Sequence, residues 1–208
     1  TYKIPAMIEF RDKTVAQWGL TLIVGKNQDA LSRGMSHEQG RLTCCSALKT
    51  EGLRQTVEEN RIGGLILGIR GDEEGSRGKE RVFSPRNYRN EWNTKEQPPE
   101  FWDTYKTDFP PGDHIRVHPI LRWTELDIWR YIARENIPVT DLYFSDTNGF
   151  RYRSLGCAPC TMPIRSQARN VDEIITELEQ TTEGERAGRA QDQEDSHAME
   201  KLRAKGYM

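Results

Sequence analysis

The chain has 208 residues, of which 35% are hydrophobic and 30% are charged, and its formal net charge is −2. The length suits one domain with at most one appendage, and the apolar share lies below the roughly 45–50% (glycine included) of ordinary globular domains. The near-neutral charge excludes a global attraction to nucleic acid or membranes, and no run of apolar residues is long enough to span a bilayer. No secretory signal opens the chain, so we expect a cytoplasmic protein, where cysteine clusters more often bind metal than form disulfides.

Helical and strand-like segments alternate along the chain. Four segments have the apolar spacing of helices: residues 5–18, 46–58, 124–137 and 171–181. Three short apolar runs are typical of buried strands in a parallel sheet: residues 20–25, 64–70 and 115–121. The clearest helix is 124–137, where Thr124 is a good N-cap. This alternation predicts an α/β fold with an open, mostly parallel sheet.

The domain boundaries follow from composition. We expect an α/β domain over residues 1–170 and a carboxy-terminal helix and arm over residues 171–208. Residues 182–208 contain few large apolar side chains and many charges, which is typical of a solvated or partner-bound arm. Three strands are few for an open sheet, and the chain opens on a helix, so we expect a strand–loop–helix unit upstream.

The stretch LGIRGDEEGSRGKER, residues 67–81, carries the most chemical information. It follows a predicted buried strand, and open α/β sheets bind ligands at that position. It sets cations and carboxylates among small residues: Arg70, Arg77, Lys79, Arg81, Asp72, Glu73, Glu74, Gly68, Gly71, Gly75, Ser76 and Gly78. Small residues let backbone amides approach a ligand, and arginines favour bidentate contacts with phosphate or sulfate. A salt-bridged polar loop is the alternative, but the position and the glycine density favour anion binding.

Extended to GIRGDEEGSRGKERVFSPR, this stretch resembles the signature loop of the small catalytic subunit family of bacterial ATP sulfurylase (sulfate adenylyltransferase subunit 2). That family belongs to the superfamily of the adenylyl-sulfate and phosphoadenylyl-sulfate reductases. Further segments resemble the family in the same order: EFRDKTVAQWGLTLIV, LKTEGLRQ, IRVHPILRWTELDIWRYI, RYRSLGC and GERAGRAQDQEDSHAMEKLRAKGYM. The similarity covers nearly the whole chain, and its last segment is the most specific.

The resemblance implies an adenine-nucleotide-hydrolase-like, Rossmann-type fold and adenylyl transfer from ATP to sulfate, with Mg²⁺ on the phosphates. It also implies a GTPase large subunit as partner. The groups expected on phosphate and sulfate are Arg70, Arg77, Lys79 and Arg81, with Gly68 and Ser76 beside the substrate and Arg151 and Arg153 as second-line candidates. Asp72 and Glu73 are expected to orient these cations or to hold a metal.

Two features depart from the family. The SGGKDS-like nucleotide loop is absent from these 208 residues, and we expect it in the upstream segment. The cysteines form the pairs Cys44–Cys45 and Cys157–Cys160, a CC…CxxC pattern that resembles the iron–sulfur adenylyl-sulfate reductases. Four thiolates can hold a 4Fe–4S cluster or, alternatively, zinc. Buried thiols that merely pack are the third possibility.

Three other functions are alternatives to sulfate activation. A sulfonyl reductase needs a further nucleophilic cysteine, and none follows Cys160. The runner-up is an iron–sulfur sulfurtransferase that acts on nucleic acid, in DNA phosphorothioation or tRNA thiolation, with basic contacts to the backbone. A scaffold that binds a GTPase without turnover is a non-enzymatic alternative. The histidines have no metal spacing, and His118 is expected to be structural.

Overall fold

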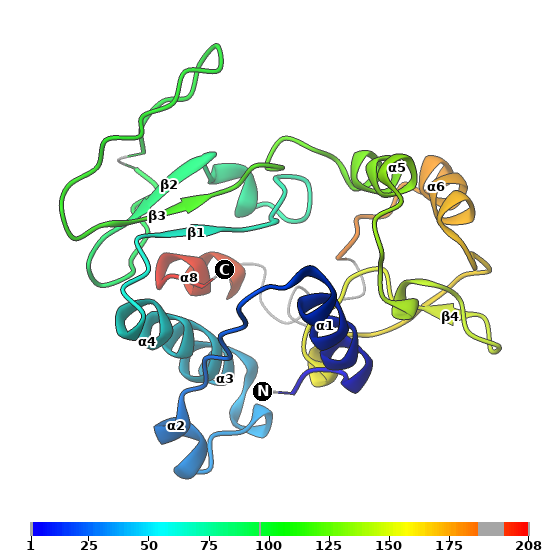
Figure 1. Cartoon of the computed structure of the whole chain (residues 1–208), viewed down its shortest axis with the longest axis horizontal. Helices are drawn as coiled ribbons and strands as arrows, with labels where there is room; N and C mark the ends of the chain where they lie inside the picture. The colour runs from blue at the N-terminus through cyan, green and yellow to red at the C-terminus, as the bar shows by residue number, and fades with distance from the viewer. Residues whose placement is uncertain (1, 96, 187–197, 208) are drawn as a thin grey trace. The chain divides into compact units, whose positions relative to one another are not determined.

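The computed structural model describes residues 2–95, 97–186 and 198–207 (Figure 1). The chain divides into two compact units. The unit that we call the helical unit comprises residues 2–24 and 124–186, and the sheet unit comprises residues 25–123 and 198–207, masked positions apart. Each unit has its own buried apolar cluster. Within the described ranges, every helix is too short or too polar to cross a lipid bilayer.

The helical unit consists of three helices, two short strands and two 3-10 turns among its described residues. Its helices and strands are α1 (Pro5–Trp18), α5 (Glu125–Glu135), α6 (Val171–Gln180), β4 (Phe150–Arg151) and β5 (Ile164–Arg165), with 3-10 turns at Asp141–Tyr143 and Ala158–Cys160. Thr124 caps α5 through a capping box with Asp127, as the sequence predicts. The core joins α5 to α6 through the buried side chains of Trp129, Ile174 and Leu178.

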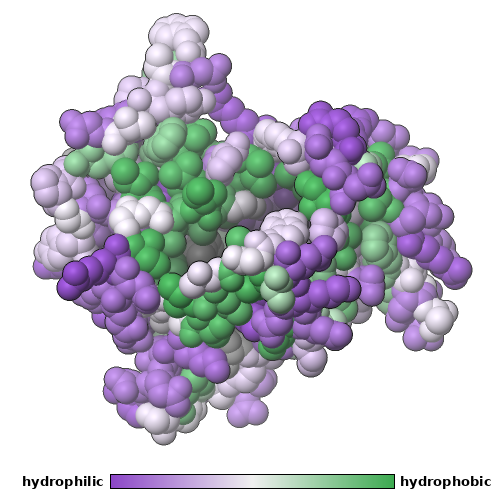
Figure 2. Space-filling model, in the orientation of Figure 1, coloured by the Kyte–Doolittle hydropathy of each residue, from purple (hydrophilic) through white to green (hydrophobic). Residues whose placement is uncertain are grey.

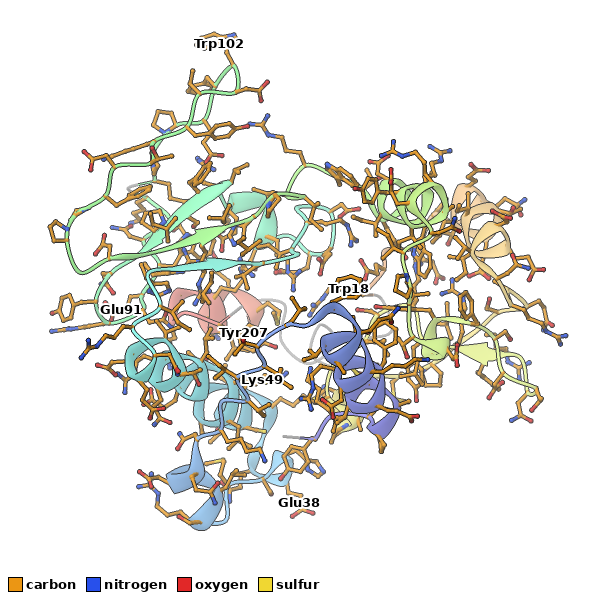
Figure 3. The ribbon with its side chains drawn as sticks, viewed as in Figure 1. Trp18, Glu38, Lys49, Glu91, Trp102 and Tyr207 are labelled. Carbon is orange, nitrogen blue, oxygen red and sulfur yellow. The ribbon has the colours of Figure 1, made fainter. Side chains whose placement is uncertain are left out.

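The sheet unit holds the remaining elements. Its helices are α2 (Gln28–Ser32), α3 (Arg41–Cys45), a π turn (Ser46–Thr50), α4 (Glu51–Glu59) and α8 (Ala198–Ala204), with 3-10 turns at His37–Gln39 and Arg77–Lys79. Its strands are β1 (Gly64–Ile66), β2 (Phe83–Arg86) and β3 (His114–Val117). The long loop between β2 and β3 carries Trp102 at its tip, where the side chain is 93% exposed (Figure 3).

The sheet is small and mixed, so the α/β class stands while the expected open, mostly parallel sheet is not confirmed. The strand order is β1–β3–β2. β1 is parallel to β3, with Leu65 opposite Arg116, and β2 is antiparallel to β3, with Ser84 opposite Arg116. The sequence FSPR of β2 contains a proline and buries Ser84 and Arg86. Because its buried positions are polar, apolar periodicity gives no sign of this strand.

The run at residues 20–25 is not a strand, which corrects the expectation from its apolar sequence. These residues have no regular secondary structure. Leu20, Leu22, Ile23 and Val24 are 41–54% exposed. A strand needs a neighbour for its backbone hydrogen bonds, and no described residue pairs with this run. Apolar residues are visible at the molecular surface between charged regions (Figure 2).

The described end of the chain packs into the sheet unit instead of forming a solvated arm. Met199 and Leu202 of α8 are 5% and 2% exposed and form an apolar cluster with Cys45 of α3. The Arg116 guanidinium in β3 donates to the backbone oxygens of Gly206 and Tyr207 at 2.6 and 3.1 Å. Figure 1 shows α8 between the sheet and the α3–α4 segment. An extended arm is therefore not confirmed here, and residues 187–197 lie outside the described residues.

Candidate anion-binding site

The loop after β1 folds back against the segment that follows β3. The amide of Leu67 donates to the Val117 oxygen at 2.8 Å, and the amide of Gly71 donates to the Leu121 oxygen at 2.8 Å. A Cβ atom at Gly71 would lie 3.2 Å from that same Leu121 oxygen, which is tighter than ordinary contact. The glycine therefore allows the close approach of two backbones, and it brings residues 71–81 beside residues 121–122.

Two carboxylates of the loop hold its arginines in place. The Glu73 carboxylate accepts from the Arg70 amide at 3.1 Å and from the Arg77 guanidinium. The Arg70 Nε atom donates to Asp72 at 3.0 Å. Arg70 and Arg77 are only 7% and 8% exposed, so their ion pairs are shielded from bulk water. Asp72 and Glu73 thus orient the cations, which is one of the two roles expected for them.

Other residues of the predicted set point elsewhere. The Ser76 hydroxyl donates to Glu74 at 2.6 Å. The Lys79 ammonium lies 2.6 Å from Glu200 of α8, in an ion pair that is about half exposed. These contacts stabilise the loop and its attachment to α8, and neither Ser76 nor Lys79 lines the cavity described next.

A cavity of about 470 Å³ opens beside the loop, and its lining includes three guanidinium groups and the carboxylates of Glu80 and Glu100. Arg77 and Arg81 come from the loop, and Arg122 comes from the segment after β3. Gly71 and Gly78 form part of the wall, where no side chain blocks access to the backbone. The structure thus brings Arg77 and Arg81 together, as predicted, and adds Arg122. A sequence signal for Arg122 existed, because it directly follows the predicted strand 115–121, at the strand end where such sheets bind ligands.

The Arg81 guanidinium is held by backbone oxygens and has no carboxylate partner among the described residues. Its Nε atom donates to the Pro98 oxygen at 3.1 Å, and Nη1 donates to the Glu80 oxygen at 3.2 Å. Among the residues that the structure describes, Arg81 has hydrogen bonds to backbone oxygens only and no ion pair. These bonds fix the guanidinium without neutralising it, so it is suited to an anionic ligand.

One of the carboxylates that line the cavity, Glu80, is buried. Glu80 is 3% exposed and accepts from Arg86 at 2.8 Å, from Ser84 at 2.6 Å and from Arg203 of α8. Burial raises the pKa of Glu80, but the charges of Arg86 and Arg203 outweigh it and hold the pKa below its usual value. Burial lowers the pKa of Arg86 to about 10. Glu80 therefore stays ionised and links the loop to β2 and α8.

His118 contacts the backbone of Arg81. Its Nδ1 atom lies 2.8 Å from the Arg81 backbone oxygen. Burial lowers the pKa of His118 to about 4, so the ring is neutral near pH 7. A neutral ring that donates from Nδ1 satisfies the Arg81 oxygen, and this agrees with the structural role expected for His118.

Arg151 and Arg153 lie in the helical unit and have carboxylate partners there. Arg151 of β4 is 1% exposed and donates to Ser166 at 3.0 Å and to Glu177 at 2.5 Å. Arg153 holds Glu125 with two hydrogen bonds, at 3.0 and 2.6 Å from Nε and Nη2. Burial opposes the charge of Arg153, but the hydrogen bond and charge of Glu125 raise its pKa. Both arginines belong to the unit that does not contain the loop, and their contact with substrate stays a prediction.

The cysteine pairs belong to different units. Cys44 and Cys45 end α3 in the sheet unit, and Cys45 is 2% exposed in the apolar cluster with Met199. Cys157 and Cys160 bracket a 3-10 turn in the helical unit, where the Cys160 amide donates to the Cys157 oxygen at 2.9 Å. No group of three or more His, Cys, Asp or Glu side chains suited to a metal ion occurs in the described ranges. A four-thiolate site is therefore not confirmed.

Comparisons with known proteins show the family of the chain. Residues 1–163 match the Phosphoadenosine phosphosulfate reductase domain. Curated relatives named sulfate adenylyltransferase subunit 2 include those of Trichlorobacter lovleyi, 38% identical over 100% of this chain and 78% of the relative, and Aeromonas salmonicida, 39% identical over 99% and 76%. The Caulobacter sp. relative is 39% identical over 100% of this chain and 77% of its own length. The chain therefore belongs to the family of sulfate adenylyltransferase subunit 2 and contains a phosphoadenosine phosphosulfate reductase domain.

Proposed function

We propose that the protein activates sulfate by adenylyl transfer from ATP. A sulfate oxygen attacks the α-phosphorus, the bond from that phosphorus to the oxygen bridging it to the β-phosphorus breaks, and the products are adenylyl sulfate and pyrophosphate. The observation that carries the proposal is the arginine-lined cavity after β1, in a chain whose curated relatives are named sulfate adenylyltransferase subunit 2.

The positive charge of the cavity arginines suits a reaction between two anionic substrates. Sulfate and the triphosphate are both anionic, so their approach brings together negative charge that must be offset. Arg77 and Arg81 are fixed in advance by Glu73 and by backbone oxygens, respectively. Charges that are oriented before the reaction lower the barrier without reorganisation during it. We assign Arg81 and Arg122 to the anionic oxygens, and we assign Arg77 both to the cavity wall and to the loop scaffold.

The loop carboxylates do not fit a Mg²⁺ site held by the protein. Asp72 and Glu73 already accept from Arg70 and Arg77. Mg²⁺ in such enzymes is bound largely by substrate phosphates and water, with one or two carboxylates. We therefore propose that Mg²⁺ arrives with the nucleotide, and we assign no step to a metal bound by this chain.

The four thiols are not used in this proposal. A 4Fe–4S cluster, with zinc as the alternative, stays a prediction from the CC…CxxC pattern, because the described side chains contain no suitable metal group. The upstream nucleotide loop also stays a prediction. We further propose a larger partner subunit, which the designation "subunit 2" of the relatives supports. That this partner is a GTPase rests on the family resemblance.

The test is exchange of labelled pyrophosphate into ATP, measured with and without sulfate. We expect exchange that depends on sulfate, and its loss in Arg81→Ala. The matched control is Arg33→Ala, because the Arg33 Nε atom also donates to a backbone oxygen at 3.1 Å but lies outside the cavity. Exchange that ignores sulfate and depends on an added nucleic acid would instead support a sulfurtransferase. Equal activity in the wild type and Arg81→Ala would show that the cavity is not the active site.

A further inference from the structure

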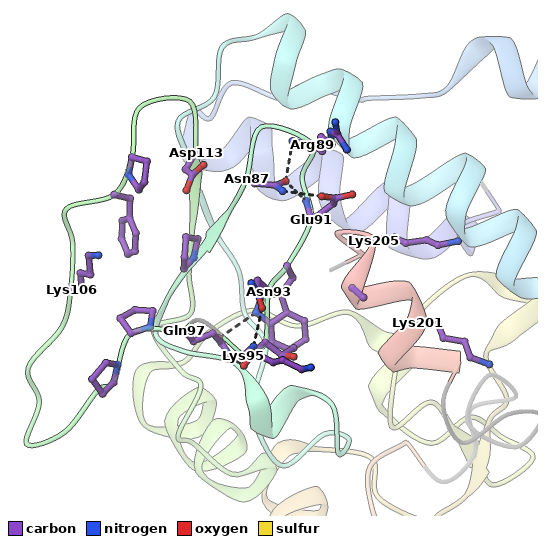
Figure 4. Close-up of a pocket in the computed structure, with 18 residues that line it drawn as sticks. Asn87, Arg89, Glu91, Asn93, Lys95, Gln97, Lys106, Asp113, Lys201 and Lys205 are labelled. Atoms are coloured by element: carbon purple, nitrogen blue, oxygen red, sulfur yellow. Dashed lines mark hydrogen bonds between the residues drawn. The ribbon is translucent and has the colours of Figure 1, made fainter.

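A second, larger depression lies on the sheet unit next to α8. Its volume is about 1360 Å³, and the long loop between β2 and β3 forms one side while α8 forms the other. Figure 4 shows Lys106 and Asp113 on the loop, Lys201 on α8, and Lys205 directly after the end of that helix. We call this depression the basic groove, after the cations that line it: Arg89, Lys95, Lys106, Lys201 and Lys205.

Among the described residues that line the groove, cations outnumber carboxylates. The described lining includes two carboxylates, Glu91 and Asp113. Glu91 already accepts a hydrogen bond from Asn87 at 2.9 Å. Among the described residues, Lys95, Lys106 and Lys205 have no ion pair. In a chain of net charge −2, such a local excess favours an anionic ligand.

The size and the walls of the groove favour a polypeptide. Small-molecule pockets are usually about 300–1,000 Å³, so this depression suits a longer ligand. Pro98, Pro99 and Pro110 line it, and their rigid rings offer apolar contact to an extended chain. Lysines act as flexible point charges, which suits carboxylates at variable positions.

The groove has little that would stack nucleic-acid bases. Trp92 lies in its lining, but the side chain is 5% exposed, with the guanidiniums of Arg86 and Arg203 against its ring at 5.2 and 5.3 Å. Single-stranded nucleic acids are bound by accessible aromatic rings beside a positive groove. Phe109 also lines the groove, and the Lys106 ammonium lies 5.8 Å from the centroid of its ring. Both rings are thus engaged by cations of the chain itself, which favours an acidic protein segment over a nucleic acid.

We propose that the basic groove binds an acidic, extended segment of a partner protein. The groove and the arginine-lined cavity share one wall, which includes Gln97 and Pro99. Gln97 donates to the Lys79 backbone oxygen at 2.7 Å, and Pro98 of the same segment accepts from Arg81. A segment bound in the groove would thus contact the back of the wall that positions Arg81. The proposal rests on the groove and is independent of the reaction assigned to the cavity.

The experiment measures binding of a fluorescent 12-residue peptide of alternating glutamate and proline, by anisotropy, to the full chain. The variant is Lys106→Glu/Lys205→Glu, which reverses one charge on each side of the groove. The matched control is Lys13→Glu/Lys26→Glu, because these lysines are also exposed and without an ion pair in the described part, but lie outside the groove. Comparison probes are the same peptide with glutamine for glutamate and an oligothymidylate of 12 nucleotides.

We expect the acidic peptide to bind the wild type and the control variant equally, and the groove variant about ten-fold more weakly. The glutamine peptide should not bind. Sulfate-dependent pyrophosphate exchange should be retained by the groove variant, which separates this test from that of the proposed function. Failure of the acidic peptide to bind, an equal loss in both double variants, or tighter binding of the oligothymidylate than of the peptide would each overturn the proposal.

Discussion

Glu80 in the loop that carries the cavity arginines is ion-paired with Arg203 in α8, near the carboxy-terminal end of the described chain. The two residues are 3% and 1% exposed, and Arg86 binds the same carboxylate oxygen at 2.8 Å. An exposed ion pair between Lys79 and Glu200 runs beside it. The last helix is therefore part of the scaffold that positions the candidate site.

Removing the charge of Glu80 should destabilise the protein strongly. In Glu80→Gln, Arg86 and Arg203 would stay buried without their carboxylate, and such a loss costs about 3–5 kcal/mol. Urea unfolding followed by circular dichroism measures this free energy. The control is Lys79→Gln, which removes the neighbouring exposed ion pair and should cost less than about 1 kcal/mol. Similar costs in the two variants would show that the buried pair does not hold α8 in place.

The fold should lose stability between pH 7 and pH 5 because of its buried histidines. Burial lowers the pKa of His118 to about 4, with the charges of Arg86 and Arg203 acting in the same direction and those of Glu80 in the opposite one. Burial and the neighbouring charges of Arg116 and Arg86 lower the pKa of His114 to about 4. An unfolded histidine takes up a proton near pH 6.5, so below that pH the unfolded state binds more protons and is favoured.

His118→Asn should weaken this pH dependence. Asparagine keeps a donor near the Arg81 oxygen but does not titrate, so the variant should lose less stability than the wild type on acidification. The difference between pH 7 and pH 5 is about 2 kcal/mol at most. Urea unfolding at both pH values measures it, with the exposed His37→Asn as the control. An unchanged slope in His118→Asn would assign the acid sensitivity to other groups.

The parts of the fold that could be predicted from sequence are those specified locally. The helices predicted at residues 5–18, 124–137 and 171–181 have apolar spacing and local signals at their ends: Pro5 and Gly19 for the first, and the N-caps Thr124 and Asn170 for the other two. β2 and α8 could not be predicted in this way, because tertiary partners stabilise them. Ser84 and Arg86 of β2, and Arg203 of α8, are buried polar groups whose partners are far away in the sequence or on another element. The apolar run at residues 20–25 shows the converse, since hydrophobicity without a strand partner gives no strand.

The residues of the candidate site could be predicted where they come from one continuous stretch of sequence. The loop at residues 67–81 contains the glycines, the arginines and the carboxylates that orient them. Arg122 was missed because it reaches the cavity through the contact between Gly71 and Leu121, which joins segments about fifty residues apart in the sequence. Lys79 and Ser76 were assigned to the substrate by residue type, but their partners in the fold are Glu200 and Glu74.

Arg122→Ala should reduce sulfate-dependent pyrophosphate exchange while leaving stability nearly unchanged. Its side chain is 55% exposed and paired with Asp103, so the fold loses little without it. Loss of one positive charge that faces developing anionic charge typically costs about 10²–10³-fold in rate. Arg130→Ala is the control, because Arg130 is also 55% exposed and paired with a carboxylate, Glu179, outside the cavity. Equal activity in both variants would show that Arg122 does not take part in the reaction.

The cysteine pattern makes a separate prediction about iron. If all four thiolates bind a 4Fe–4S cluster, protein purified without oxygen should be brown and contain about four iron atoms per chain. Cys160→Ser should then lose the iron and the colour, and so should Cys45→Ser, because each would remove one ligand.

If Cys45 only packs, its apolar contacts with Met199 and Leu202 predict a different result. Cys45→Ser would then lower the free energy of unfolding, iron would be absent from the wild type, and Cys160→Ser would leave the metal analysis unchanged. Iron content and urea unfolding of the two variants therefore distinguish a ligand from a packing residue at Cys45.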